Sequence, residues 1–193
     1  MSWFNYYGLA IMAIILIPNI IYAIKHKNDV APTYTNKKIV IAEQIGRYGC
    51  FILMIFNIPY TYFNFWFDSA LIVYLSVNGS LCLAYLIFWI ICWRQNGKIK
   101  ALSLSIIPSC IFLFSAIVLA YVPLIAFSIL FASSHIFISY KNATQKNSRR
   151  KKPTKEDKIK DAFLLLFVIL LFALAVIGTL FDSGTGKGAF PLN

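Results

Sequence analysis

Charged side chains are scarce in this sequence, and their scarcity restricts the class of protein. Only 13% of the 193 residues are charged, whereas 60% are hydrophobic; in ordinary soluble domains about a quarter of the residues are charged. No segment between the apolar runs is long enough to bury a core of its own. The composition therefore excludes soluble domains and indicates a single transmembrane domain over residues 1–193.

Metal-binding and disulfide patterns are also missing. The sequence holds four cysteines and two histidines, and no two cysteines have the CxxC spacing of a metal or redox site. Cys50, Cys82, Cys92 and Cys110 all lie in apolar runs, where a free cysteine behaves as a small apolar side chain. We therefore expect no metal and no cofactor.

Acidic residues are few, with seven against 18 lysines and arginines, so the net charge is +11. A basic chain can indicate nucleic-acid binding, but position argues against it here. All but two of the 18 basic residues fall in the loops 25–38, 94–100 and 141–160. Basic residues in alternate loops are typical of loops retained in the cytoplasm. We therefore expect these three loops to be cytoplasmic, and we expect no nucleic-acid partner.

Six apolar runs have about the 20 residues that a helix needs to cross a bilayer. They span about 4–23, 39–59, 70–92, 101–121, 124–140 and 162–181. No lysine or arginine precedes the first run, which favours an outside N-terminus, and six crossings return the tail 182–193 to the outside. The expected fold is an all-α bundle of six transmembrane helices. Richness in Ile, Lys, Asn and Phe favours a bacterial plasma membrane.

Two opposite charges, Glu43 and Arg47, lie inside the second run. With Cys50, Met54 and Asn57 they are spaced by four, three, four and three residues, so all five share one helical face. Glutamate four residues before arginine is the favourable order for an ion pair. A charge inside a bilayer costs several kcal/mol unless it pairs, faces water or reaches the interface. We therefore expect this face to point into the bundle.

Helix depth suggests further partners for this pair. Glu43 lies four residues into the second run, and His135 lies five residues before the end of the fifth. Both side chains are then roughly 6–8 Å below the cytoplasmic surface, and Asn19 of the first run lies at about that level. We expect an intramembrane polar cluster of Asn19, Glu43, Arg47 and His135. A structural ion pair and a functional site both remain open.

The longest basic loop, 141–160, carries four consecutive cations, Arg149, Arg150, Lys151 and Lys152. A basic side chain near a membrane surface attracts anionic headgroups by about 1 kcal/mol. The same charges also act as a topology signal. We expect the bilayer, its anionic lipids on the cytoplasmic face and other membrane subunits as partners.

Two short patterns resemble motifs of the CAAX-type intramembrane proteases. Glu43-x-x-x-Arg47 is similar to the motif EExxxR of that family, and Phe131-x-x-x-His135 is similar to FxxxH. The resemblance implies a glutamate that activates water and a histidine that assists it. The chain departs from the family in having Ala42 at the first glutamate and in lacking the third motif, HxxxN.

Three classes of function are therefore open. A transporter of a small solute or ion, or a subunit of one, is favoured by the polar face and by Pro18 and Pro108, which we expect to break helices. A membrane enzyme acting on a lipid or lipidated peptide would use Glu43 as base, His135 as acid–base or oxyanion partner and Arg47 to bind an anionic headgroup. A non-catalytic assembly or immunity partner fits the small size. The enzyme is less favoured, because one ion pair and one histidine are not a catalytic signature.

Overall fold

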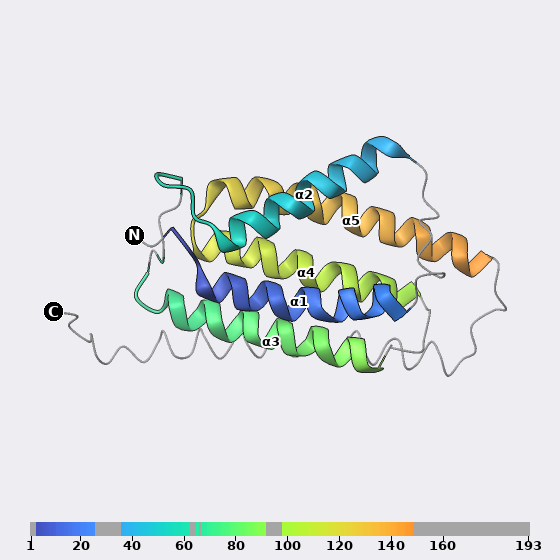
Figure 1. The fold of residues 1–193 in the computed structure, drawn as a ribbon, viewed down its shortest axis with the longest axis horizontal. Helices are drawn as coiled ribbons and strands as arrows, with labels where there is room; N and C mark the ends of the chain where they lie inside the picture. The colour runs from blue at the N-terminus through green and yellow to red at the C-terminus, as the bar shows by residue number, and fades with distance from the viewer. Residues whose placement is uncertain (1–2, 26–35, 62–64, 66, 92–97, 149–193) are drawn as a thin grey trace.

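The structure is a computed structural model that describes residues 3–25, 36–61, 65, 67–91 and 98–148. Within these residues the chain forms α1 (Tyr6–Lys25), α2 (Lys37–Ile55), α3 (Ala70–Ile91), α4 (Lys98–Val118) and α5 (Val122–Ser148). No strand occurs in these ranges, so the described part of the chain is all-helical, as the sequence predicts (Figure 1).

Four of the described helices are long and apolar enough to cross a membrane: α1, α3, α4 from Ala101 and α5 as far as Thr144. The four suggest a membrane protein. The helix α2 has a similar length but carries two lysines, Glu43 and Arg47, and is therefore not among them. The sixth predicted span, 162–181, and the tail 182–193 lie outside the described residues.

The helix α2 ends at Ile55, earlier than the expected end near Pro59. The next residue, Phe56, is extended, with φ −112° and ψ 127°. It forms an antiparallel bridge with Phe4, because the Asn57 N–H donates to the carbonyl of Trp3 over 2.9 Å. Pairing with the N-terminal segment thus replaces the last helical turn, and Asn57 lies outside the helical face on which we expected it.

The helix α5 continues through Ser148, beyond the expected end at Tyr140. The first part of the expected loop 141–160 is therefore helical. The extension KNATQKNS contains no proline or glycine, so nothing in it forces a helix to stop. The prolines expected to break α1 and α4 also fail to do so, since both helices continue through Pro18 and Pro108.

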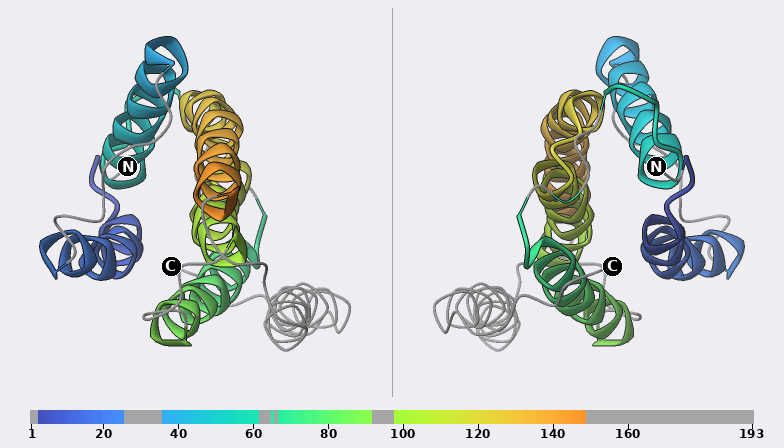
Figure 2. Two further views of the ribbon diagram at one scale, coloured as in Figure 1. Left: turned by 90° about the vertical axis from the view of Figure 1, so that its right-hand side faces the viewer. Right: turned by 90° about the vertical axis from the view of Figure 1, so that its left-hand side faces the viewer.

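The helix α4 packs between α3 and α5, α2 packs on α5, and α1 packs on α2 and α3. Figure 2, which looks along the bundle, shows α1 and α2 on one side and α3, α4 and α5 on the other. Lysines lie where α1 ends, where α2 begins and in the last part of α5. These three points are at the same end of the bundle (Figure 1). This end is called the basic end below.

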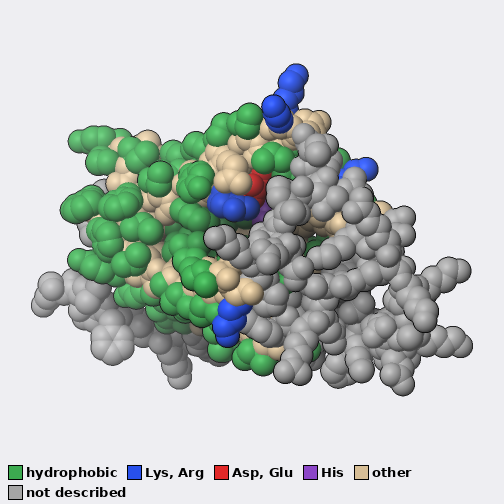
Figure 3. Space-filling view, turned by 45° about the vertical axis from the view of Figure 1, so that its right-hand side comes forward, with side chains coloured by type: hydrophobic (Ala, Val, Ile, Leu, Met, Phe, Trp, Pro, Cys, Tyr) green, Lys and Arg blue, Asp and Glu red, His purple; other side chains and the backbone are tan. Residues whose placement is uncertain are grey.

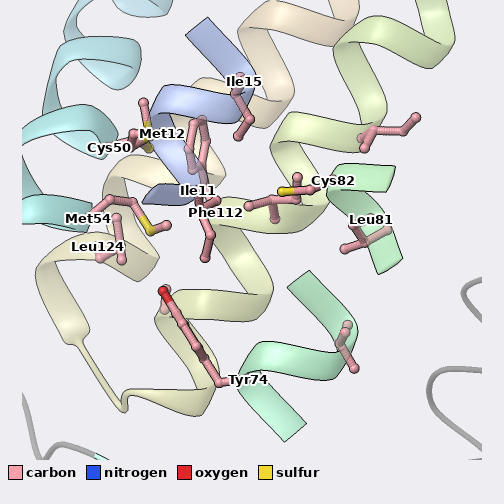
Figure 4. Close-up of a cluster of buried hydrophobic side chains, with 14 of the residues drawn as sticks. Ile11, Met12, Ile15, Cys50, Met54, Tyr74, Leu81, Cys82, Phe112 and Leu124 are labelled. Carbon is pink, nitrogen blue, oxygen red and sulfur yellow. The ribbon is translucent and has the colours of Figure 1, made fainter. Parts of the chain in front are cut away.

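Every described helix contributes a fully buried side chain to the core. One example from each helix, in chain order, is Met12, Met54, Tyr74, Phe112 and Leu124, each at most 1% exposed. Figure 4 shows these side chains converging between the helices. At Gly8, a Cβ atom would lie 1.8 Å from the backbone carbonyl oxygen of Met54. Contact between α1 and α2 therefore requires glycine at this position.

We expect Gly8→Ala to push α1 away from α2 and to lower the melting temperature of the detergent-purified chain. Gly79→Ala is the matched control, because a Cβ atom at Gly79 meets nothing within 4 Å. Alanine has a better helix propensity than glycine by about 1 kcal/mol, so the control should melt at the same or a higher temperature. Equal melting of the two variants would contradict the close contact.

Candidate functional site

The candidate site depends on a close contact between α2 and α5. At Gly46 of α2, a Cβ atom would lie 2.7 Å from the backbone nitrogen of Phe131 on α5. At Gly49, it would lie 2.2 Å from the ring of Phe127. Small residues allow helices to approach this closely within a membrane. Side chains that flank Gly46 on α2 are thereby brought against α5.

Glu43, Arg47 and His135 meet at this contact and are called the Glu43 cluster below. The Arg47 guanidinium, one turn along α2, donates to Oε1 of Glu43. The same oxygen lies 2.9 Å from Nδ1 of His135 on α5, a hydrogen-bond distance at which a protonated Nδ1 donates. One carboxylate oxygen therefore joins the two helices.

The face of the His135 imidazole is also in contact with an aromatic ring. The imidazole stacks on the ring of Phe131, one turn earlier on α5, with centroids 4.6 Å apart and planes at 18°. Phe131 in turn packs edge-on against Phe112 of α4, with centroids 5.5 Å apart. The carboxylate at its edge and the aromatic ring on its face together restrict the orientation of the imidazole.

Burial differs among the three members of the cluster. The side chain of Glu43 is 4% exposed, whereas Arg47 and His135 are 36% and 22% exposed. Figure 3 shows an acidic and a histidine side chain partly covered beside a basic one. Burying an unpaired carboxylate costs several kcal/mol, and a hydrogen-bonded cation offsets much of that cost. The arrangement is a buried carboxylate in contact with two partly exposed side chains.

The cluster lies near the basic end of the bundle. Glu43 is six residues after Lys37, the first residue of α2, and His135 is six residues before Lys141 on α5. Along each helix this is about 9 Å at 1.5 Å per residue. The carboxylate and the imidazole therefore meet at the same distance from the lysines that mark this end, as the depth argument predicts.

Asn19, expected in the cluster, is hydrogen-bonded elsewhere. Its side-chain amide donates to the carbonyl of Ile15 over 2.9 Å and to the hydroxyl of Tyr85 on α3 over 2.7 Å. Asn19 lies six residues before Lys25, so its depth matches that of Glu43. Depth does not specify which neighbouring helix a side chain faces, and here Asn19 faces α3. The structure joins three of the four expected residues.

Buried polar contacts extend beyond the cluster. The thiol of Cys50 lies 3.8 Å from the hydroxyl of Ser128, linking α2 and α5 again. The amide of Asn78 on α3 donates to the hydroxyl of Ser115 on α4 over 3.0 Å, and neither residue is exposed. Tyr85, the partner of Asn19, is not among the residues that we expected in the cluster. The spacing of Asn78 and Tyr85 by seven residues places both on one face of α3 and was the available signal.

The sequence predicts headgroup contacts and no metal. The expected headgroup contacts, Arg149, Arg150, Lys151 and Lys152, lie outside the described residues. For a metal, the described ranges contain no group of three or more His, Cys, Asp or Glu side chains close enough to hold an ion. The Glu43 cluster itself brings together a carboxylate, a guanidinium and an imidazole, which are groups for proton and anion chemistry.

Comparison with known proteins finds no matching family model, no similar curated protein and no similar solved structure. The resemblance to CAAX-type proteases therefore stays limited to Glu43, Arg47, Phe131 and His135. The structure brings the two short patterns together, since His135 lies against Glu43 and stacks on Phe131.

A double-mutant cycle tests whether the pair acts as a unit. We expect Glu43→Gln or Arg47→Met alone to destabilise the chain by about 1–3 kcal/mol, because each leaves a charge without its partner, and Arg47 is partly exposed. The double variant should be less destabilised than the sum of the singles. Unfolding free energies in mixed detergent measure the coupling, and additive single effects would show that the two charges do not interact.

Proposed function

We propose that the chain crosses a bacterial plasma membrane six times, with both termini outside and its basic end in the cytoplasm. Four apolar helices support embedding, and the basic end fits the preference of lysine and arginine for the cytoplasmic side. Support for including α2 comes from the face that it exposes. This face carries the exposed apolar side chains of Ile41, Ile45, Tyr48 and Ile52, which are spaced by four, three and four residues.

The proposed activity is transport of a small solute or ion, by the chain alone or as a subunit, with the Glu43 cluster as its proton-holding site. The observation that carries this proposal is the contact between the buried Glu43 carboxylate and the imidazole of His135 across two helices. Ionisable residues inside membrane segments commonly form proton relays in pumps and transporters. A partly exposed histidine against a buried glutamate has the composition of such a relay.

Proton transfer within the cluster would change how α2 is held. With neutral His135, the Glu43 carboxylate and the Arg47 guanidinium balance each other. A proton that enters through His135 and moves from Nδ1 to Oε1 neutralises the carboxylate. Arg47 then keeps a hydrogen bond but loses its counter-ion, and one uncompensated positive charge remains near the contact between α2 and α5. Proton uptake is thereby coupled to helix packing, which is the requirement for proton-linked transport.

Proton flux into liposomes tests this proposal. We expect the reconstituted wild-type chain to acidify a dye-loaded interior when a pH gradient and a potassium diffusion potential are imposed. Glu43→Gln, which keeps the shape of the side chain and removes its titration, should lower the rate at least tenfold. Asp68→Asn is the control, because Asp68 is an exposed acid outside the cluster. Wild-type flux equal to that of empty liposomes, or equal flux in both variants, would contradict proton transport.

A membrane enzyme acting on a lipid or lipidated peptide is a second candidate. The 2.9 Å contact between Glu43 and His135 favours it, since a carboxylate and an imidazole in contact can act as base and acid on a water molecule. The exposed part of Arg47 would then contact an anionic group of the substrate.

The enzyme candidate predicts product formation by the purified chain. Prenylated peptides and phospholipid vesicles would be incubated with wild type, with Glu43→Gln and with the control Asp68→Asn, and the products identified by mass spectrometry. Cleavage by wild type and Asp68→Asn but not by Glu43→Gln would support catalysis. No cleavage of either substrate, or cleavage that persists in Glu43→Gln, would exclude Glu43 as the base for these reactions.

A further inference from the structure

A second feature lies on the face of α5 that points away from the Glu43 cluster. It is a shallow groove of about 400 Å³ between α4 and α5, lined by Leu102, Ala132, Ser133, Ile136, Phe137 and Tyr140. Its volume is within the range of roughly 300–1,000 Å³ that small-molecule sites occupy. The wall is almost entirely apolar.

The groove is separate from the cluster because of helical geometry. Ser133, Phe137 and Tyr140 are spaced by four and three residues and share one face of α5. His135 lies two residues from Ser133 and two from Phe137, which is about 200° around the helix and therefore on nearly the opposite side. Ala132 and Ile136, which also line the groove, are only about 60° and 100° from His135, so the part of the groove that faces away from the cluster is the part at Ser133, Phe137 and Tyr140.

A cation lies at the end of the groove that is closer to the basic end of the bundle. The ammonium group of Lys141 is 5.6 Å from the centroid of the Phe137 ring, and Lys141 follows the lining residue Tyr140. The helical continuation of α5 to Ser148 keeps Lys141 on the helix rather than in a loop. The groove thus combines an apolar wall with a positive charge at one end.

We infer that this groove binds one anionic phospholipid, with an acyl chain along the apolar wall and the phosphate near Lys141. Charge complementarity supports this occupant, since a cation at the rim of an apolar surface fits an anionic headgroup above a hydrocarbon chain. The surroundings support it as well. Phe137 and Tyr140 are substantially exposed on α5, a helix apolar enough to span a membrane, and in a bilayer the exposed side chains of such a helix would meet acyl chains. This inference does not rest on the proposed transport activity.

Lipid retention by the purified chain tests the inference. The chain would be equilibrated with equal amounts of phosphatidylglycerol and phosphatidylcholine, and the lipid retained would be identified by native mass spectrometry. We expect one retained lipid per chain, with phosphatidylglycerol preferred. Ser133→Trp should fill the groove and abolish retention. Lys141→Gln should lower the preference for phosphatidylglycerol about fivefold, the effect of one basic side chain near a headgroup.

Two matched variants control for changes elsewhere on the surface. Ser76→Trp places the same ring on an exposed position of α3, and Lys37→Gln removes an exposed lysine at the start of α2. Both should retain lipid as wild type does. The inference is overturned if wild type retains no lipid, if Ser133→Trp retains as much as Ser76→Trp, or if Lys141→Gln and Lys37→Gln show the same preference. Filling of the groove by another part of the chain or by a second copy would appear as the first of these outcomes.

Discussion

The close contact of α2 with α5 at Gly46 is the constraint on which the candidate site depends. A side chain at Gly46 would collide with the backbone of Phe131, so the absence of one sets how near the helices come. That distance is short enough for a glutamate on α2 to reach a histidine on α5. The contact between Glu43 and His135 therefore depends on glycine at position 46.

The packing of α2 on α5 also explains how a helix with four charges can belong to a mostly apolar bundle. The face of α2 that holds Glu43, Cys50 and Met54 is buried, and its charged member is bonded by Arg47 and His135. The opposite face presents exposed isoleucines. The Glu43 carboxylate is thus covered by protein, Arg47 is only partly covered, and the opposite face of the helix is apolar.

Much of this arrangement could be predicted from sequence, and the gaps have physical causes. Periodicity along one helix places Glu43, Arg47 and Cys50 on a common face. The position of His135 just before the basic loop 141–160 indicates its depth in the bundle. Neither pattern specifies how another helix is rotated about its own axis. For this reason the sequence does not predict that Asn19 faces Tyr85. The early end of α2 depends on a bridge to Phe4, a long-range pairing without a local signal. The longer α5 reflects a polar sequence that is compatible with helix as well as with a loop.

The bridge between Phe4 and Phe56 has a mechanical consequence. It ties the segment before α1 to the end of α2 by backbone hydrogen bonds, including one of 2.8 Å from the Asn5 N–H to the carbonyl of Ile55. Any tilt of α1 must therefore carry that end of α2 with it. The bridge therefore fixes the start of α1 to the end of α2 that is remote from Glu43, whereas no such backbone pairing joins the lysine-bearing ends of the two helices in the described residues.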